Sequence, residues 1–245
     1  MRPGQNQAVQ QKIDGNRQFA SAYVGTWLAK EDALERTGKV FSKLALAADA
    51  ALEEWEEMRK QSGDSHEMAC KDGCDYCCRQ PVMVTPLEVF ALADWLKANL
   101  KKPDLDDLSK RASEYLNAMQ KCEGFGEYPD VARTACPVLK DHRCSGYEAR
   151  PFMCRAYHSF SLEQCIERFE HGDSKPVDHN SPALYAAVMH RVGAAQKIHE
   201  MGKPSPQVVL GGAIAIALTE KDVEQRWLNG ENVFARAEVK SPNQA

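Results

Sequence analysis

The sequence predicts an all-α or nearly all-α protein in which a helical domain encloses a loop-borne cluster of cysteines. Apolar residues recur at spacings of three and four over most of the chain, which is the pattern of amphipathic helices. No segment shows the sustained alternation of apolar and polar residues that is typical of strands. Seven of the nine cysteines fall in two short, turn-rich segments, 70–78 and 136–154.

Length, composition and charge place the chain among ordinary globular proteins. It has 245 residues, enough for one large domain or two small ones, with 43% hydrophobic and 27% charged residues. The net charge of −4 gives no electrostatic reason to expect a nucleic-acid partner. Residues 1–7 lack the apolar core of a secretory signal, and the longest apolar run, 208–218, is about half of the ~20 residues that span a bilayer. We therefore expect a cytoplasmic protein without a membrane or nucleic-acid partner.

The first quarter of the chain is predicted to be a flexible terminus followed by helices. Residues 1–16 are rich in Gln and interrupted by Gly and Pro, so they are expected to be flexible. Residues 17–62 carry apolar side chains at helical spacing, including Phe19 and Tyr23, and should form N-terminal helices that pack on the core. Gly38 is the expected break between two of these helices.

Residues 63–170 are expected to form the cysteine-cluster core. Between the two cysteine segments, Thr85-Pro86-Leu87-Glu88 offers Thr as N-cap, Pro at the first helical position and Glu at the third, which is a capping-box start. An apolar stripe behind it predicts a helix, and a second helix is expected over 104–121. Ser161 should cap a short helix that carries Cys165 on its apolar side.

Residues 171–235 are expected to add C-terminal helices to the same domain. Ser181-Pro182 is a start signal for a long helix. Ser205-Pro206 should start a second, strongly apolar helix that runs through Leu218 and is buried. Residues 236–245 are expected to be a flexible tail.

The chemistry of the cysteines favours a metal site. Thiolates are soft ligands that bind zinc, copper(I) or iron–sulfur clusters far better than calcium or magnesium. Thiols stay reduced in the cytosol, so nine cysteines there favour metal or redox chemistry over disulfides. The spacing Cys74-x2-Cys77 lets the backbone turn around one ion, and Gly73 can supply the positive φ of such a turn. We expect a multi-cysteine site for zinc or an iron–sulfur cluster.

The number of ligands decides what kind of site is expected. In extended backbone the neighbours Cys77 and Cys78 would point to opposite faces, which favours two metals or one ligand and one packing residue. Seven thiolates would leave one open position, whereas eight would complete two four-sulfur sites. Cys165 is equally well interpreted as a core residue or a ligand, and Cys122 as structural or free. The candidate ligands are Cys70, Cys74, Cys77, Cys78, Cys136, Cys144, Cys154 and Cys165.

Basic residues and histidines lie among these cysteines. Arg150 and Arg155 bracket Cys154, where they could offset the negative charge of metal-bound thiolates. His142 and His158 are alternative ligands for a mixed site, although a lone histidine is more often a surface or hydrogen-bonded residue.

Three blocks between residues 70 and 158 form a compound pattern. The first block is the cluster of four cysteines. The second consists of Thr85-Pro86 with Glu88 and, further along the chain, Cys136-Pro-Val-Leu. The third is Cys144-x2-Tyr147-x2-Arg150-Pro151-x2-Cys154-Arg155 with Tyr157. This pattern resembles the bacterial CxxCxxCC, or YkgJ-like, family of cysteine-cluster proteins, described as zinc- or iron-chelating domains. The resemblance implies metal chelation and groups Tyr147 and Tyr157 with the two arginines around the ligands, but it implies no substrate.

The first spacing departs from the family, because Cys70 and Cys74 are separated by three residues instead of two. Cys70-x3-Cys74-x-Tyr76-Cys77 also matches the cluster signature of radical S-adenosylmethionine enzymes, and flagellin lysine methylases look like relatives of the cysteine-cluster family. Such enzymes place the motif after the first strand of a partial barrel, and this sequence lacks the corresponding alternation of strands and helices.

Three functional classes therefore stay open. The first is a metal-binding protein with a redox or metal-handling role. The second is a cluster-dependent enzyme such as a methyltransferase, although no catalytic acid–base pair, HExxH or GxSxG motif can be nominated. The third is a zinc-stabilised helical module that binds a protein partner. Whether the protein is an enzyme is left undecided by the sequence.

Overall fold

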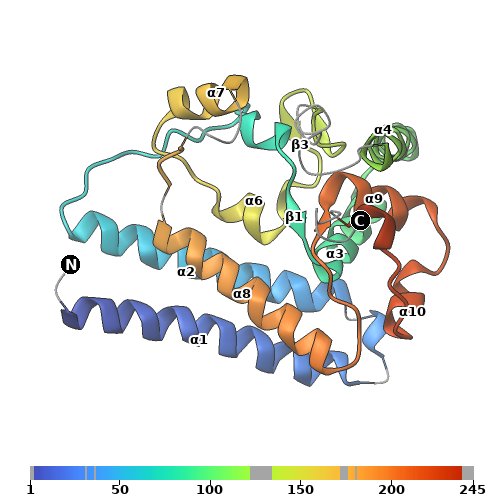
Figure 1. Ribbon diagram of the computed structural model, residues 1–245, viewed down its shortest axis with the longest axis horizontal. Coiled ribbons are helices and arrows are strands. Elements are labelled where there is room, and N and C mark those ends of the chain that lie inside the picture. The colour runs from blue at the N-terminus through green and yellow to red at the C-terminus, as the bar shows by residue number, and fades with distance from the viewer. Residues whose placement is uncertain are drawn as a thin grey trace.

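Three long helices form one side of the molecule. The computed structural model describes residues 3–30, 32–35, 37–121, 134–171, 176–179 and 181–238. Helices α1 (Pro3–Leu28), α2 (Thr37–Gln61) and α8 (Ser181–Glu200) lie side by side, with α8 in contact with both others (Figure 1). The mostly helical fold that the sequence predicts is confirmed.

Two expectations for the N-terminal region are wrong. Helix α1 begins at Pro3, so residues 3–16 are helical, because Val9 and Ile13 pack in a small apolar cluster with Trp55 of α2 and Ala183 of α8. The break between the first helices lies before Gly38, where the short 3-10 helix η1 (Ala33–Glu35) intervenes.

Gly38 instead lies in the first turn of α2. A Cβ atom there would lie 3.2 Å from a carboxylate oxygen of Asp94 and 3.8 Å from the Cα atom of Ala91. The glycine therefore serves the close approach of α2 to α3 (Pro86–Asn99) instead of a helix break.

A second group of helices packs beside the first. It contains α3, α4 (Lys102–Gln120), α9 (Leu210–Thr219) and α10 (Val223–Leu228) (Figure 1). The predicted capping box starts α3, with the Thr85 N–H donating to the Glu88 carboxylate at 2.7 Å. Helix α9 is buried along almost its whole length, as its apolar sequence predicts. A single apolar core joins both groups of helices.

The segment before α9 is extended, which corrects the predicted helix start at Ser205-Pro206. Val208–Val209 form strand β4, which pairs antiparallel with β1 (Met83–Val84) in the register Met83↔Val209. Both valines are fully buried, and β-branched side chains favour extended backbone. The pairing satisfies their backbone groups inside the core, and α9 begins only at Leu210.

The start of the expected C-terminal tail is also packed. The 3-10 helix η4 (Ala235–Ala237) buries Ala237, and Glu238 forms a β-bridge with Val208. Of the tail expected over 236–245, residues 239–245 lie outside the described residues.

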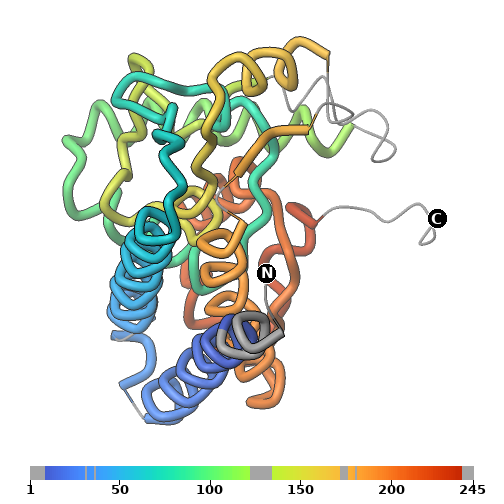
Figure 2. Tube along the Cα trace, turned by 90° about the vertical axis from the view of Figure 1, so that its left-hand side faces the viewer, coloured from blue at the N-terminus to red at the C-terminus, as the bar shows by residue number. Residues whose placement is uncertain are grey.

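The cysteine-bearing elements lie beside the ends and upper faces of these helices (Figures 1 and 2). Figure 2, which looks along the long helices, shows most of the cysteine-bearing elements at the top of the view, while α6 lies lower and contacts α2 and α8. The loops thus rest on a helical frame. The elements that carry cysteines are η2 (Tyr76–Arg79), β3 (Arg143–Cys144), α6 (Phe152–Ala156) and α7 (Leu162–His171), and β2 (Leu139–Lys140) and η3 (Tyr147–Ala149) lie between them in the chain.

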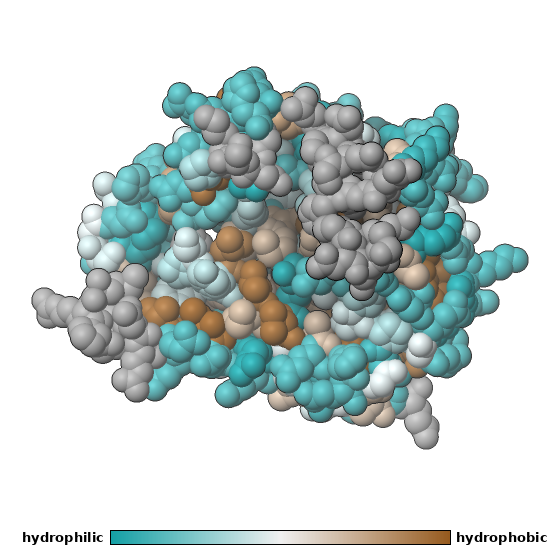
Figure 3. Space-filling model, in the orientation of Figure 1, coloured by the Kyte–Doolittle hydropathy of each residue, from teal (hydrophilic) through white to brown (hydrophobic). Residues whose placement is uncertain are grey.

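The surface is mainly hydrophilic on the face drawn in Figure 3, where apolar atoms gather near the middle of the view. Within the described part of the chain, none of the helices has the length and apolar character needed to cross a lipid bilayer.

Candidate metal centre

The first cysteine segment folds as a turn followed by a 3-10 helix. Gly73 has a φ of +83°, a conformation that glycine adopts without strain, and the Cys74 N–H closes the turn on the Lys71 carbonyl at 3.0 Å. The Cys78 N–H donates to the Asp75 carbonyl at 2.9 Å. These local bonds give the cysteines of residues 74–78 a defined arrangement.

The second cysteine segment joins the first through the backbone. The Cys136 N–H donates to the Cys78 carbonyl at 2.8 Å. Strands β2 and β3 then form a tight hairpin in which Leu139 pairs with Cys144, and its two turn residues, Asp141 and His142, have positive φ. Such a two-residue turn matches the twist of the strands it connects.

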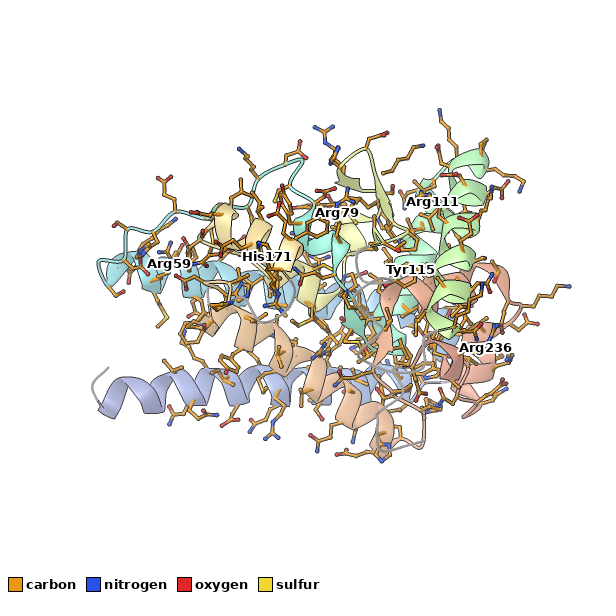
Figure 4. The ribbon with its side chains drawn as sticks, turned by 45° about the horizontal axis from the view of Figure 1, so that its top comes forward. Arg59, Arg79, Arg111, Tyr115, His171 and Arg236 are labelled. Carbon is orange, nitrogen blue, oxygen red and sulfur yellow. The ribbon has the colours of Figure 1, made fainter. Side chains whose placement is uncertain are left out.

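A side chain from α4 secures this hairpin. Arg111 donates to the Pro137 carbonyl at 2.5 Å and to the Leu139 carbonyl at 2.8 Å. Figure 4 shows Arg111 on α4 and Arg79 on η2 in the upper part of the molecule, where the cysteine loops lie. The second segment is therefore held both by a helix and by the first segment.

Cys70 is held by the chain that follows α6. The Ala69 N–H donates to the Ser159 carbonyl at 2.9 Å, and the Ser159 N–H donates to the sulfur of Cys70 at 3.3 Å. Helix α7 comes next, and the predicted cap is present, because Ser161 accepts the Gln164 N–H at 3.2 Å.

Four cysteines form what we call the outer set: Cys70, Cys74, Cys77 and Cys165. Cys70 is exposed and the other three are half-buried. Although Cys70 as a whole is exposed, its sulfur is partly buried against Ser159; this burial is the main cause of the raised pKa of Cys70, and the other three sulfurs of the set add to that increase. Burial also raises the pKa of Cys74, with further contributions from Cys77 and Cys165. These thiols are close enough to influence one another's ionisation.

The other four form the inner set: Cys78, Cys136, Cys144 and Cys154. Burial raises the pKa of Cys136 to about 12, and the neighbouring Cys144 adds to the effect. Burial likewise raises the pKa of Cys154 well above its ordinary value, with Cys136 and Cys144 as the next contributors of the same sign. Thiols in such surroundings release their protons readily only when a cation replaces them.

Cys77 and Cys78 connect the two sets. Their backbone is a 3-10 helix and not extended, so the predicted opposition of their side chains does not hold. The Cys78 thiol donates a hydrogen bond to the Cys77 sulfur, which lowers the pKa of Cys77 to about 7 and raises that of Cys78. Cys77 also raises the pKa of Cys144 and Cys154, so its sulfur faces both sets.

The sulfurs of either set do not yet surround a common point. Among the residues that the structure describes, no three side chains of His, Cys, Asp or Glu converge closely enough to form a finished metal site. The donor chemistry does fit a soft metal, because each set supplies four thiols from adjoining loops. Cys122 lies outside the described residues.

Arg150 has an unpaired donor beside these thiols. Its Nε atom is buried and has no hydrogen-bond partner among the described residues, and its guanidinium lies 3.8 Å from the ring centroid of Tyr147. After burial and a backbone hydrogen bond, the charge of Arg150 is the next influence on the pKa of Cys144, which it lowers. An unused donor and a positive charge are what a negatively charged thiolate–metal group requires nearby.

Arg155 binds the backbone of the loop between Cys144 and Cys154 and not the cysteine sulfurs. It forms an ion pair with Asp49 of α2 at 2.5 Å and donates to the carbonyls of Arg150, at 2.8 Å, and Glu148. Its side chain is only 8% exposed. The arginine thus fixes the chain that leads from Cys144 to Cys154 against the helical frame.

The two tyrosines and two histidines have other neighbours. Tyr147 is exposed and stacks on Arg150, whereas the ring of Tyr157 lies 4.2 Å from that of His179. His142 is mostly exposed and its Nδ1 atom lies 3.1 Å from an Asp75 carboxylate oxygen. Burial lowers the pKa of His158. These contacts connect His142 with the centre only through Asp75.

Two acidic residues of the centre were not predicted as parts of it. Asp75 is buried and pairs with Arg79 at 2.7 Å, and only its place in the sequence between Cys74 and Cys77 could have signalled this. Glu88 is fully buried, and besides capping α3 it accepts the Phe152 N–H of α6 at 3.1 Å. The sequence indicated the cap but not this link to the helix that carries Cys154.

The fold and the site define a helical protein that carries a cysteine-rich domain suited to chelating a soft metal. Residues 69–172 match the family model CxxCxxCC, described as a "putative zinc- or iron-chelating domain". The resemblance seen in the sequence is therefore confirmed over this segment, and a metal-binding role is supported. No curated protein and no solved structure matches the chain.

Proposed function

We propose that this is a metal-binding protein whose eight thiols form two four-sulfur sites, one from the outer set and one from the inner set. The observation that carries the proposal is the grouping of the thiols around the vicinal pair Cys77–Cys78, with Cys165 as the fourth member of the outer set. The backbone bond from Cys136 to Cys78 and the bond from Ser159 to the Cys70 sulfur bring the contributing loops together. Four thiolates complete the coordination of a tetrahedral zinc ion, and they also hold an iron–sulfur cluster.

When bound, the metal would supply a cross-link between segments that are otherwise joined by few bonds. The outer set comes from the 70–77 segment and α7, and the inner set from residue 78, the hairpin and α6. Arg150 would donate its free Nε–H toward the thiolates and offset part of their negative charge. Because unfolded chains lack such sites, the binding free energy of the metal adds to the stability of the fold.

Cluster-dependent radical chemistry has no support from this fold. Among the described residues the strands are only two residues long and pair in two separate two-stranded sheets. They therefore do not form the strand–helix alternation of a partial barrel. The proposal is accordingly limited to metal binding, with zinc and iron–sulfur separated by experiment.

Metal analysis of protein purified without oxygen tests the proposal. We expect two four-sulfur sites per chain, seen either as about two zinc ions in a colourless protein or as iron and sulfide with visible absorption. Cys154→Ala and Cys74→Ala should each reduce the metal content, while Lys71→Ala, an exposed substitution beside Cys70, should not. Wild-type protein that binds no zinc, iron or copper would overturn the proposal.

A further inference from the structure

Helix α7 is attached to the rest of the molecule much more weakly than α6, the other α-helix that carries a cysteine. No residue of Leu162–His171 is fully buried. Its main packing partner is η2, where the ring of Phe169 lies 5.8 Å from that of Tyr76. In Figures 1 and 2 the helix lies at the upper edge of the molecule, away from the long helices.

Cys165 lies on the side of α7 that faces this contact. The half-buried residues Cys165, Ile166 and Phe169 share one side of the helix, whereas Glu163 and Glu167 are exposed. Cys165 and Phe169 are four residues apart, so their side chains lie on the same helical face. The Cys165 thiol therefore lies on the same face of α7 that packs against η2.

The inner set is held in a different way. Cys136 and Cys144 pack against the apolar core, the hairpin between them is bound by Arg111, and α6 is anchored through Glu88. Arg155 adds an ion pair to α2. Opening the inner set would therefore disturb the core, whereas lifting α7 would break the contact with η2 and the 2.7 Å hydrogen bond that the Asp178 N–H donates to Gln164.

From this asymmetry we propose that the outer set is the site at which metal enters and leaves, and that the lifting of α7 with Cys165 opens it. This inference rests on the proposed function. On opening, the bond between the metal and the Cys165 sulfur breaks, the thiolate takes a proton from solvent, and a competing thiol ligand can take the vacated position. The exposed Cys70 is the second point of access for such a ligand. The inner set keeps its metal and acts as a structural site.

Hydrogen–deuterium exchange of metal-loaded and metal-free protein tests the role of α7. In wild type, metal should slow amide exchange in peptides covering 162–171 several-fold, because Cys165 ties the helix to the outer set. Cys165→Ala should abolish that protection but retain the metal-dependent protection of the hairpin at 139–144. Glu167→Ala, an exposed change on the same helix, should behave like wild type.

Chelator challenge of the loaded protein tests the order of release. Metal should leave wild type in two steps of similar size, and Cys165→Ala should lack the fast step while keeping the slow one. Release in a single step, or equal protection of α7 in wild type and Cys165→Ala, would overturn this inference while leaving metal binding intact. Protein that never binds metal would instead overturn the proposed function.

Discussion

Replacing Arg155 with alanine should destabilise the protein strongly, because this side chain joins the cysteine domain to the long helix α2. Its guanidinium pairs with Asp49 at 2.5 Å and donates to the carbonyls of Arg150 and Glu148. Burial lowers the pKa of Arg155 and the Asp49 carboxylate opposes that effect, so the ion pair offsets part of the cost of burying the guanidinium charge. The substitution removes all three interactions at once.

The size of the loss follows from burial. Truncating one partner of a buried ion pair costs about 3–5 kcal/mol, but the Asp49 side chain is 34% exposed and water can replace part of what it loses. We therefore expect the lower end of that range, about 3 kcal/mol. In a chain of this size each kcal/mol moves the midpoint of thermal unfolding by about 2–4 °C, which gives a decrease of roughly 6–12 °C.

Thermal and urea unfolding of the metal-loaded protein measure this loss. The metal concentration must be held constant, because ligand binding adds its own stability. Arg143→Ala is the matched control: its pair with Asp72, at 2.6 Å, has side chains 72% and 71% exposed and should contribute less than about 1 kcal/mol. Arg155→Lys keeps the positive charge but lacks the several N–H donors of the guanidinium, so its stability should lie between those of wild type and Arg155→Ala.

Two results would refute the reasoning. One is a loss of under about 1 kcal/mol for Arg155→Ala, because an ion pair on the protein surface contributes no more than that and the burial of Arg155 would then add nothing. The other is additivity of Arg155→Ala with Asp49→Ala, because residues in direct contact should show an interaction energy of at least about 0.5 kcal/mol.

Further predictions concern the helical frame. Burial raises the pKa of Glu224 to about 7 from 4.5, so its carboxyl holds a proton more tightly when folded, and stability should fall as pH rises through that interval. Glu224→Gln should remove this part of the pH dependence, and identical urea-unfolding profiles for both proteins between about pH 4 and pH 8 would contradict it. Gly193→Ala places a Cβ well inside van der Waals contact with the Arg17 carbonyl oxygen and should cost at least about 1–3 kcal/mol. Gly15→Ala in α1 meets nothing within 4 Å and should instead stabilise by about 0.5–1 kcal/mol; equal effects of the two glycine substitutions on thermal unfolding would count against the packing argument.

Local signals in the sequence were sufficient wherever neighbouring residues determine the structure. The capping box at Thr85 and Glu88 and the cap at Ser161 depend on residues three apart, and both are present. The strand at Val208–Val209 depends on a partner more than a hundred residues away, which no local pattern reveals. The same holds for α1, in which Val9 and Ile13 pack against side chains of α2 and α8.

The sequence was sufficient to predict that the cysteines chelate a metal, but not how their side chains are arranged. Spacing alone indicated chelation, while the conformation of Cys77 and Cys78 depends on a 3-10 helix that their sequence does not indicate. The apolar stripe of α7 was compatible with a core position for Cys165. The stripe instead lies on η2, so Cys165 is half-buried within the outer set and not in the core.

The difference in packing between the inner and outer sets also determines how much each bound metal would stabilise the fold. The apolar core is built from the long helices with α3, α4 and α9, and among the described cysteines Cys136 and Cys144 are those that pack against it. Losing metal from the inner set should therefore loosen the hairpin and, through it, the core. Losing metal from the outer set should loosen only α7 and the 70–77 segment. A protein built in this way can exchange one metal without unfolding, because the exchange is confined to the part of the chain that contributes least to the core.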